Sequence, residues 1–565
     1  MTRTLSIVVV ILAMAGGSSL VTAMAQTPAQ APTQSSTDLT SKVDALFAPA
    51  SRPGSPGCVC SVIRNGKTLY TKGHGLADLE RNVPITAESV FYIGSTSKQF
   101  TAASIALLVL DGKLSLSADV RTLIPELKNI GAAVTVEQLV HHTSGVREYN
   151  GLLGLQGWRD PDRLNNEIII ALLARQRSLN FTPGSQFLYS NSNYVLLAEI
   201  VKRVSGKPLP QFAKERLFDP LGMKDTQFES DASRIVRNRV LSYGRSGGSY
   251  FQFHKTIEAY GAGNLLTTVG DLALWDENFY TAKVGGKPLL DMFQLKGVLS
   301  NGTPANYGFG LGYGEYRGLP IVQHSGGNQG YRAQLTRFPK QHFSVMVLCN
   351  QADIDPDALV SRVADIYLAS ELAPTNAQIA ATPVEAAIDP DLLDGYVGRF
   401  AFDANPQFVM TFTRDGDNFY AQATGQQRAQ IYPSSENEFF YKVVNAKVTF
   451  HRESDGATNR ITLHQNGDRG ASRVQEFVPS SADMQQYIGK FYSDELDVTL
   501  EIALKGTALE VRAKGVPPGI LQPNRRDSFN NGSIAINFRR NAQGQIVSLS
   551  VGAGRVQNMI FVKQP

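Results

Sequence analysis

Cysteine, tryptophan and charge are all scarce in this chain of 565 residues. It has 3 cysteines and 2 tryptophans, and charged residues make up 18%. So few cysteines exclude a disulfide-rich scaffold. The net charge of +4 is spread without long basic runs, whereas a dedicated nucleic-acid-binding protein needs a clustered basic face, so we expect no nucleic-acid partner. Hydrophobic residues reach 42%, which excludes disorder as the main state and supplies several folded cores.

Long apolar runs are also rare, and the one that matters lies at the N-terminus. Residues 1–25 carry Arg3, then an apolar run, and end in Ala23-Met24-Ala25. This pattern predicts a secretory signal peptide that is cut before Gln26. A membrane anchor is the alternative, but the run is shorter than the ~20 residues that a spanning helix needs. Residues 26–37 are expected to form a disordered tether. We therefore expect an exported, periplasmic protein with no integral membrane span.

Residues 38–370 show a mixed pattern of helices and strands. Strands are predicted near both ends of this segment and helices between them, which indicates an α+β domain with one sheet built from both ends. The predicted strands are 58–63, 67–71, 307–313, 331–338 and 343–348, and the predicted helices include 100–110, 194–204 and 269–280.

The remaining third of the chain contains an internal repeat. Residues 371–390 are rich in Ala, Pro and Thr and are predicted to be a linker. Tyr-Val-Gly-Arg-Phe at 396–400 recurs as Tyr-Ile-Gly-Lys-Phe at 487–491, and further matches follow in the same order. Two tandem antiparallel β-barrels, residues 391–480 and 481–565, explain this pattern best.

The first candidate catalytic motif is Ser95-Thr96-Ser97-Lys98, at the start of the predicted helix 100–110. Positions i and i+3 share a helix face, so the Lys98 amine can reach the Ser95 hydroxyl. A partly buried lysine loses its charge easily and can act as a base toward a serine. The alternative is a capping serine with a surface lysine.

A second motif, Tyr189-Ser190-Asn191, lies between Pro183-Gly184 and a predicted helix. A tyrosine can relay a proton when a nearby cation lowers its pKa. Asn191 could donate a hydrogen bond to a substrate carbonyl and hold the lysine. The alternative is a core tyrosine followed by a capping asparagine.

The third motif, His324-Ser325-Gly326-Gly327, precedes the predicted strand 331–338. Its glycines permit a close approach of backbone and ligand. An N–H group here that faces the N–H of Ser95 would form an oxyanion hole. The alternative is a turn with a polar histidine.

Together, the order and spacing of the three motifs resemble those of the serine β-lactamase and penicillin-binding protein superfamily. The nearest pattern is the class C-related branch, which includes D-aminopeptidases, DD-peptidases and esterases. The resemblance covers residues 38–370 and extends to several surrounding segments. These are Phe91-Tyr92-Ile93-Gly94, His142-Thr143-Ser144-Gly145, Phe181-Thr182-Pro183-Gly184, Gly263-Asn264-Leu265 and Asp271-Leu272.

The resemblance implies the β-lactamase/DD-peptidase fold, an antiparallel sheet flanked by helices plus a helical subdomain. It also implies that Ser95 is the acylated nucleophile and that Lys98 and Tyr189 share the general base and acid work. The substrate-binding residues would be Asn191, His324, Ser325, Gly326 and Gly327, with the N–H groups of Ser95 and Gly327 at the oxyanion.

The barrels extend the resemblance to one group of the branch. A hydrolase followed by two lipocalin-like barrels is similar to the D-aminopeptidases, in which a barrel loop reaches the active site. The candidate for that loop is residues 515–526, which are Pro-rich and long for a turn. The alternative for this segment is an exposed barrel loop with no partner.

One departure from the superfamily pattern bears on specificity. His324 stands where β-lactamases and most DD-peptidases carry a lysine that faces the substrate carboxylate, and histidine is mostly neutral near pH 7. Arg332 could restore a cation. We therefore expect an esterase or D-amino-acid amidase first, a DD-carboxypeptidase next and a weak β-lactamase last. A non-catalytic envelope protein that binds peptidoglycan or lipophilic ligands is the alternative, but it would not need Lys98 beside Ser95.

No metal or cofactor is expected, and the substrate should be a small molecule or short peptide. His141 and His142 are adjacent and lack a carboxylate or cysteine at ligand spacing, so His142 is expected to order the loop before Gly145. The glycines around Tyr313 lack a following phosphate-binding helix. The oligomeric state is not predicted.

The cysteines leave two possibilities. Cys58 and Cys60 lie on one face of a strand and are poorly placed to bond each other. In the superfamily fold the strand that ends at Cys349 runs beside the first strand, so a bridge from Cys349 to Cys58 or Cys60 is one possibility. We expect the other, three buried free thiols.

Overall fold

The structure is a computed structural model. It describes residues 36–565 except 160–162, 255, 375–384, 404, 425–427, 443–445, 455, 466, 475–476 and 533. The predicted signal peptide, residues 26–35 of the tether and the middle of the predicted linker therefore lie outside the described residues. Ser36 and Thr37, expected in the tether, already belong to helix α1. None of the helices within the described ranges has the length and apolar character needed to cross a bilayer.

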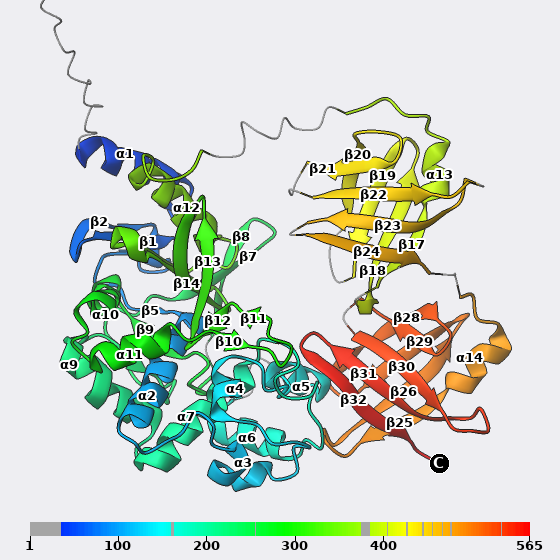
Figure 1. Ribbon diagram of the computed structural model, residues 1–565, viewed down its shortest axis with the longest axis horizontal. Coiled ribbons are helices and arrows are strands. Elements are labelled where there is room, and N and C mark those ends of the chain that lie inside the picture. The colour runs from blue at the N-terminus through cyan, green and yellow to red at the C-terminus, as the bar shows by residue number, and fades with distance from the viewer. Residues whose placement is uncertain are drawn as a thin grey trace, which may run out of the picture.

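The first unit, residues 36–374, is an α+β domain (Figure 1). Its helices are α1 (Ser36–Leu46), α2 (Lys98–Leu110), α3 (Val120–Leu123), α4 (Val136–Val140), α5 (Tyr149–Leu155), α6 (Asn166–Ala174), α7 (Asn191–Ser205), α8 (Leu209–Ala213), α9 (Asp219–Leu221), α10 (Val269–Thr281), α11 (Gly286–Phe293) and α12 (Pro356–Tyr367). The main sheet contains β1 (Cys58–Arg64), β2 (Lys67–His74), β12 (Tyr307–Gly308), β13 (Leu311–Tyr316), β14 (Leu319–Asn328), β15 (Tyr331–Phe338) and β16 (Phe343–Cys349). Short strands are β3 (Leu76–Asp78), β4 (Val83–Pro84), β5 (Phe91–Tyr92), β6 (Gln227–Phe228), β7 (Ser242–Ser246), β8 (Ser249–Phe253), β9 (Leu265–Thr267), β10 (Gly297–Val298) and β11 (Pro304–Ala305).

The main sheet is built from both ends of this unit, as the sequence predicts. In the described part of the chain its order is β12-β13-β14-β15-β16-β1-β2, and every neighbouring pair is antiparallel. Strand β1 is buried on both faces. Cys60 and Val62 pack with α1 and α12 in one apolar cluster, whereas Val59 and Ile63 belong to the larger cluster on the other face.

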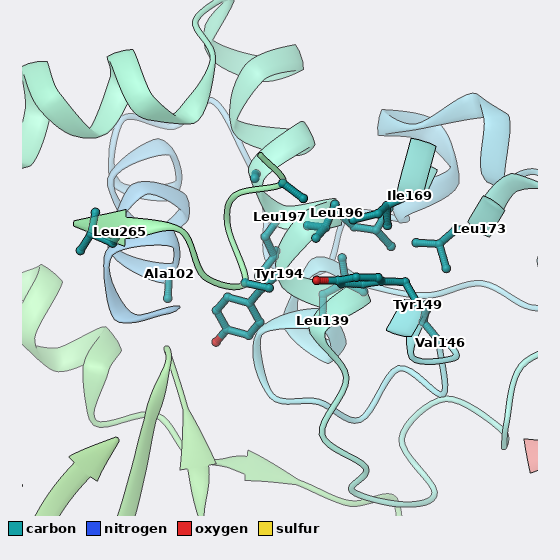
Figure 2. Packing of buried hydrophobic residues seen from close by; sticks show 14 of the residues in the cluster. Ala102, Leu139, Val146, Tyr149, Ile169, Leu173, Tyr194, Leu196, Leu197 and Leu265 are labelled. Carbon is teal, nitrogen blue, oxygen red and sulfur yellow. The ribbon is translucent and has the colours of Figure 1, made fainter. Parts of the chain in front are cut away.

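Helix α2 is the centre of the helical region that covers this other face. Its residues from Lys98 to Leu108 are all buried, and the helix ends before Gly112, which adopts a positive φ of 69° that favours glycine. Helix α7 packs against α2. Figure 2 shows Tyr194, Leu196 and Leu197 of α7 among other apolar side chains of this cluster. This packing forms a buried apolar support beneath the start of α2.

Two closed antiparallel barrels of eight described strands each follow, which confirms the interpretation of the repeat. The first contains β17 (Gly398–Phe402), β18 (Asn405–Asp415), β19 (Asn418–Ala423), β20 (Ala429–Pro433), β21 (Glu438–Tyr441), β22 (Lys447–Arg452), β23 (Thr458–His464) and β24 (Asp468–Arg473), after α13 (Leu392–Tyr396). The second contains β25 (Gly489–Ser493), β26 (Val498–Lys505), β27 (Ala508–Ala513), β28 (Val516–Arg525), β29 (Ser528–Asn530), β30 (Ile534–Arg540), β31 (Ile546–Ala553) and β32 (Val556–Lys563), after α14 (Ser481–Tyr487). The repeated tyrosines make equivalent aromatic contacts in both barrels, because Tyr396 stacks on Phe450 and Tyr487 packs on Phe538.

The second barrel docks on the helical region of the first unit, beside α5 (Figure 1). Its core is continuous with that of the first unit, whereas the core of the first barrel is a separate cluster. The buried guanidinium of Arg147 pairs with Glu495 at 2.9 Å and donates to the carbonyl oxygens of Gln557 and Asn558. The first barrel contacts the second through Arg399, which donates to Pro523 and Asn524.

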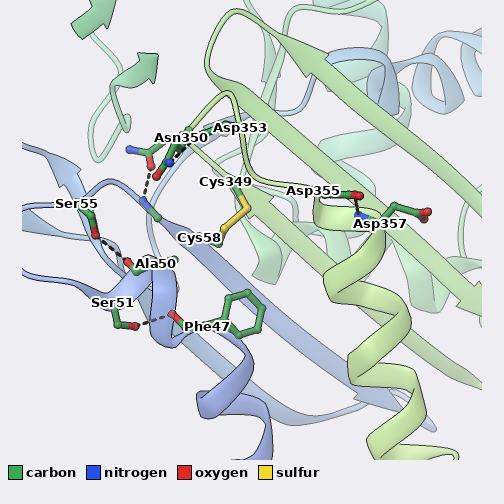
Figure 3. Close-up of a disulfide and its surroundings, with 12 residues drawn as sticks. Phe47, Ala50, Ser51, Ser55, Cys58, Cys349, Asn350, Asp353, Asp355 and Asp357 are labelled. Atoms are coloured by element: carbon green, nitrogen blue, oxygen red, sulfur yellow. Dashed lines mark hydrogen bonds between the residues drawn. A yellow bond between two sulfur atoms is a disulfide. The ribbon is translucent and has the colours of Figure 1, made fainter. Parts of the chain in front are cut away.

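The expectation of three free thiols is wrong. Cys58 and Cys349 form a disulfide, shown in Figure 3, while Cys60 is buried and free. The register explains the choice, because Cys58 lies directly opposite Cys349 on adjacent antiparallel strands and Cys60 lies opposite Val347.

The expectation of a loop at residues 515–526 is also wrong, because this segment forms strand β28. It pairs with β27 and β29, with register shifts on both sides. Such irregularities accommodate residues that cannot donate to a ladder, here Pro517, Pro518 and Pro523.

Candidate active site

Ser95 and Lys98 meet at the start of α2. Ser95 lies in a 3-10 turn, Gly94–Ser97, that leads directly into the helix. The Lys98 ammonium position, Nζ, is 3.0 Å from the Ser95 hydroxyl oxygen, 2.7 Å from the side-chain oxygen of Asn191 and 2.6 Å from the carbonyl oxygen of Ala262. The serine is therefore within reach of a base, as the spacing of the motif predicts.

The environment of Lys98 favours its neutral amine. The side chain is fully buried, and this burial lowers its pKa well below the ordinary value for lysine. The carboxylate of Glu148 acts in the opposite direction, and the positive charge of Arg555 lowers the pKa further. A lysine that gives up its proton easily can accept the proton of Ser95.

Asn191 is oriented by Glu148. Asn191 is the first residue of α7, and both its backbone N–H and its side-chain amide donate to the Glu148 carboxylate. Because the side-chain nitrogen of Asn191 donates to Glu148, the side-chain oxygen of Asn191 faces Lys98.

Tyr189 lies between Lys98 and the cleft. Its ring centroid is 4.8 Å from the Lys98 Nζ, and its hydroxyl is buried without a hydrogen-bond partner among the described residues. Burial raises the pKa of Tyr189, and the neighbouring Ser95 hydroxyl and Arg555 only partly offset this effect. Tyr189 therefore holds its proton in the resting state, which suits an acid rather than a resting base.

His324, on β14, is neutral and immobilised. One ring nitrogen, Nδ1, lies 2.6 Å from the carbonyl oxygen of Ser325, and the other, Nε2, lies 3.0 Å from the Tyr307 hydroxyl. Because a carbonyl only accepts, Nδ1 carries the proton and Nε2 accepts from Tyr307. Burial and the nearby Lys98 lower the pKa of His324 to about 3. The third motif therefore supplies no cation at neutral pH.

The glycines of the third motif let β14 lie against the segment that carries Ser95. A Cβ atom on Gly326 would be 1.9 Å from the carbonyl oxygen of Ile93, and one on Gly94 would be 2.5 Å from the backbone nitrogen of Gly327. The Gly327 amide thus lies beside the turn that begins at Gly94. This proximity suits the predicted oxyanion hole.

A cleft of about 360 Å³ opens beside Tyr189, His324 and Ser325, and Ser325 is exposed at its edge. Arg332, which the sequence offered as a substitute cation, lies next to Gly327, but its guanidinium donates to the carbonyl oxygens of Gln329 and Tyr331. The structure therefore brings together the predicted site residues. The Arg332 guanidinium instead bonds to the backbone of β15 and of the turn before it.

Three functional neighbours come from outside the motifs. His142 accepts hydrogen bonds from the backbone of Ser190 and the side chain of Asn193, so it braces the segment that carries Tyr189. Glu148 orients Asn191, as described above. Arg555, from the turn between β31 and β32, lies over the Tyr189 ring at 4.9 Å, with its guanidinium 3.8 Å from the Glu148 carboxylate.

No sequence signal marked Glu148 or Arg555 as part of the site. Arg555 is 366 positions away from Tyr189 in the sequence, and the docking of the second barrel brings it there. Within the described residues, no group of three or more His, Cys, Asp or Glu side chains is arranged to hold a metal ion.

Comparison with known families agrees with this geometry. The family model described as Beta-lactamase matches residues 43–369, more than half of the chain. The chain belongs to the beta-lactamase family. It is a serine hydrolase of the β-lactamase and penicillin-binding-protein fold, followed by two β-barrels. A second family model, described as a domain of unknown function (DUF3471), matches residues 382–477, which include the first barrel.

Relatives in this beta-lactamase family include peptidases and penicillin-binding proteins. A D-aminopeptidase of Cereibacter sphaeroides (strain ATCC 17029) is 27% identical over 450 residues, which cover 79% of this chain and 81% of the relative. Penicillin-binding protein 4* of Bacillus subtilis is 27% identical over 433 residues, 73% of this chain and 93% of the relative. The structure of the octameric penicillin-binding protein homologue from Pyrococcus abyssi has a TM-score of 0.55 at 23% identity, covers 77% of this chain and 99% of its own, and shows the shared fold.

Proposed function

We propose that this chain hydrolyses an amide or short peptide bond that follows a D-amino acid, through an acyl-enzyme on Ser95. The observation that carries the proposal is the 3.0 Å contact between Ser95 and the fully buried Lys98. The D-aminopeptidase relatives, whose similarity covers 79% of this chain, support the choice of substrate class. Ester hydrolysis by the same acyl-enzyme is the second candidate activity.

The geometry supports the following reaction. Neutral Lys98 accepts the Ser95 proton while the serine oxygen bonds to the substrate carbonyl carbon. The N–H groups of Ser95 and Gly327 donate to the oxyanion. Tyr189 gives its proton to the departing amine as the carbon–nitrogen bond breaks, and it recovers a proton from Lys98.

Water then completes the cycle. It adds to the acyl carbon and gives one proton to the Lys98–Tyr189 pair, and the ester bond to Ser95 breaks as the serine oxygen regains that proton. One water is consumed for each amide bond, and the products are a D-amino acid and an amine.

Two other functions are less well supported. A DD-carboxypeptidase or weak β-lactamase is less well supported because the third motif has the neutral His324 where β-lactamases and most DD-peptidases carry a lysine. A non-catalytic envelope protein that binds peptidoglycan or lipophilic ligands would not need a neutral lysine hydrogen-bonded to a serine.

The proposal is tested by labelling and by a substrate panel. A fluorophosphonate should label the wild-type protein at Ser95, and D-alanine p-nitroanilide should be cleaved faster than L-alanine p-nitroanilide and nitrocefin. Ser95→Ala should abolish labelling and lower turnover ~10³-fold or more, and Lys98→Ala should be nearly as severe because the two residues act as a unit. Ser117→Ala, at an exposed serine, is the matched control. Persistent labelling of Ser95→Ala would contradict the mechanism, and nitrocefin as the fastest substrate would contradict the substrate class.

We also propose that the protein is exported to the periplasm. Residues 1–25 support this through the signal-peptide pattern, and the Cys58–Cys349 disulfide suits an oxidising compartment. Cell fractionation and mass spectrometry of the native N-terminus test it. A periplasmic protein that begins at Gln26 is expected, and an intact N-terminus in the cytoplasmic fraction would contradict it.

A further inference from the structure

A second, larger pocket lies where the mouth of the second barrel meets α5. Its volume is about 650 Å³, which is in the range of sites that bind small molecules. Apolar side chains from inside the barrel and the glycine face of α5 form most of its wall. The lining residues used below are Leu500, Val511, Ala513, Gly151, Gly154 and Arg555.

The two barrels are filled differently. The repeat and the strand register place Ile502 and Leu509 of the second barrel where the first barrel has Phe412 and Phe419. These two phenylalanines pack on each other and on Phe450 inside the first barrel. Aliphatic side chains in their place fill less of the second barrel.

Helix α5 closes this mouth without filling it. Its Gly151 and Gly154 contribute no side chain, and a Cβ on Gly151 would be 2.6 Å from a methyl group of Val556. The glycine face thus permits a close approach of helix and barrel while it leaves the pocket open.

Arg555 places a solvent-accessible cation, with a side chain that is 47% exposed, at the border between this pocket and the active site. It lines the pocket and lies over the ring of Tyr189. Its side chain makes no hydrogen bond within the described ranges, and its one ion-pair contact, with Glu148, is as long as 3.8 Å. The Glu148 carboxylate already accepts hydrogen bonds from Asn150 and Asn191. An anion that enters this border can therefore pair with Arg555, whereas the Glu148 carboxylate already has donors.

Arg555 lies on the side of the leaving group. In the proposed reaction Tyr189 passes a proton to the departing amine, so this amine must lie next to the Tyr189 hydroxyl. A guanidinium that covers the Tyr189 ring is close to whatever is attached to this amine.

We propose that Arg555 and the pocket form a leaving-group subsite for an apolar amino acid with a free carboxylate. The carboxylate binds the Arg555 guanidinium and the apolar side chain enters the pocket, so the preferred substrate is a dipeptide rather than a simple amide. This subsite supplies the carboxylate-binding cation that the neutral His324 does not, and it comes from the second barrel. The inference rests on the proposed D-amino-acid peptide hydrolysis.

Matched substrates test the subsite within one enzyme. We compare D-alanyl-leucine with its C-terminal amide for the carboxylate, and with D-alanyl-glycine for the side chain. The wild type should favour D-alanyl-leucine in kcat/KM in both comparisons. Arg555→Met should reduce the preference for the free carboxylate by roughly tenfold or more, since a hydrogen-bonded charge pair is lost, while cleavage of the amide persists. Ala513→Phe should reduce the preference for leucine over glycine by filling the pocket.

A control variant separates a specific effect of Arg555 from a general effect of removing a charge from this barrel. Arg539→Met makes the same change at an exposed position of the same barrel and should leave both ratios unchanged. Unchanged ratios in Arg555→Met and Ala513→Phe, in an enzyme that cleaves D-alanine p-nitroanilide, would overturn the subsite and leave the proposed function intact.

If the wild type cleaves no D-alanyl compound, the proposed function is wrong, and calorimetry with N-acetyl-leucine then decides the subsite. Binding to the wild type that is lost in Arg555→Met supports it. The absence of binding to the wild type overturns it.

Discussion

The chemistry of this site depends on how one lysine is kept neutral. Burial acts on Lys98 most strongly, and two charged residues then act in opposite directions, Glu148 to raise its pKa and Arg555 to lower it. Asn191 adds a hydrogen bond to Nζ that is fixed in direction by Glu148. The balance of these contributions sets the fraction of enzyme that carries a base at neutral pH.

Removal of the Arg555 charge should move the pH profile of the enzyme. The rate rises with pH as Lys98 loses its proton, so the acid limb of kcat/KM follows the pKa of Lys98. Because Arg555 lowers this pKa, Arg555→Gln should raise it and shift the acid limb to higher pH. A pH series with D-alanine p-nitroanilide measures the shift, with Arg539→Gln as the control. An acid limb that stays in place, or moves to lower pH, would show that Arg555 does not tune Lys98.

The residues that the sequence predicts and those that it misses differ in one respect. Ser95 and Lys98 are three positions apart, so helix geometry brings them close, and Tyr189 and Asn191 are two positions apart at the start of α7. Arg555 reaches the same site only because a separate barrel docks there, and no local pattern records this contact.

At the scale of elements, β14 and the turn before α2 work as a pair. Thr96 donates a hydrogen bond to the carbonyl oxygen of His324 at 3.3 Å, and Gly326 packs on the backbone of Ile93. This contact holds β14 beside the turn that carries Ser95, so we expect Gly326 to position the two N–H groups of the proposed oxyanion hole.

Gly326→Ala should therefore damage catalysis more than folding. The added Cβ would be 1.9 Å from the Ile93 carbonyl oxygen, so β14 must move away from the turn. Loss of one oxyanion donor costs ~10²-fold or more in kcat, and a drop of this order with D-alanine p-nitroanilide is expected while KM changes less. Gly314→Ala on β13 is the control, because its Cβ would meet only the Ile321 side chain, at 3.7 Å. Equal kcat values for the two variants would contradict the positioning role.

Element types were predicted better than element pairings. The alternating residues of β15, the continuous apolar run of β16 and the repeated tyrosine motifs mark their strands and barrels directly. Strand β28 was missed because Pro517 and Pro518 obscure the alternation that the bulged pairing tolerates. The Cys58–Cys349 bridge depends on the register of strands almost three hundred positions apart, and a register is not contained in either strand alone.

At the scale of the whole molecule, the second barrel is packed on the catalytic domain through a continuous apolar core. The two share one apolar core, and the interface contains buried polar partners. Asn180, for example, accepts from the backbone of Gln557 and donates to the carbonyl oxygen of Arg555. The second barrel therefore contributes a side chain, Arg555, to the site.

Breaking one buried ion pair at this interface tests the coupling. Arg147 and Glu495 have side chains that are 0% and 6% exposed, and Glu495 also accepts from the backbone of Arg177. Glu495→Ala would leave the Arg147 charge buried and unpaired, which costs ~3–5 kcal/mol in the free energy of unfolding. Asp494→Ala is the control, because its contact with Arg177 is long, at 3.8 Å, and exposed, so a change within ~1 kcal/mol is expected.

The tryptophans report which part of the molecule responds. Trp275 is buried in the first unit, whereas Trp158 follows Gly157, which contacts the second barrel. In a Trp158→Phe background, the fluorescence of Trp275 during urea unfolding therefore follows the catalytic domain and not the barrel that carries Glu495. If the two parts unfold together, Glu495→Ala should lower the midpoint of this fluorescence transition, and Glu495→Gln, which keeps an acceptor oxygen, should lower it less. A fluorescence midpoint that stays at the wild-type value while circular dichroism shows earlier loss of β-structure would mean that the barrel unfolds on its own. In that case the catalytic domain would be stable without it, and Arg555 would reach Tyr189 only through a reversible docking of two independent units.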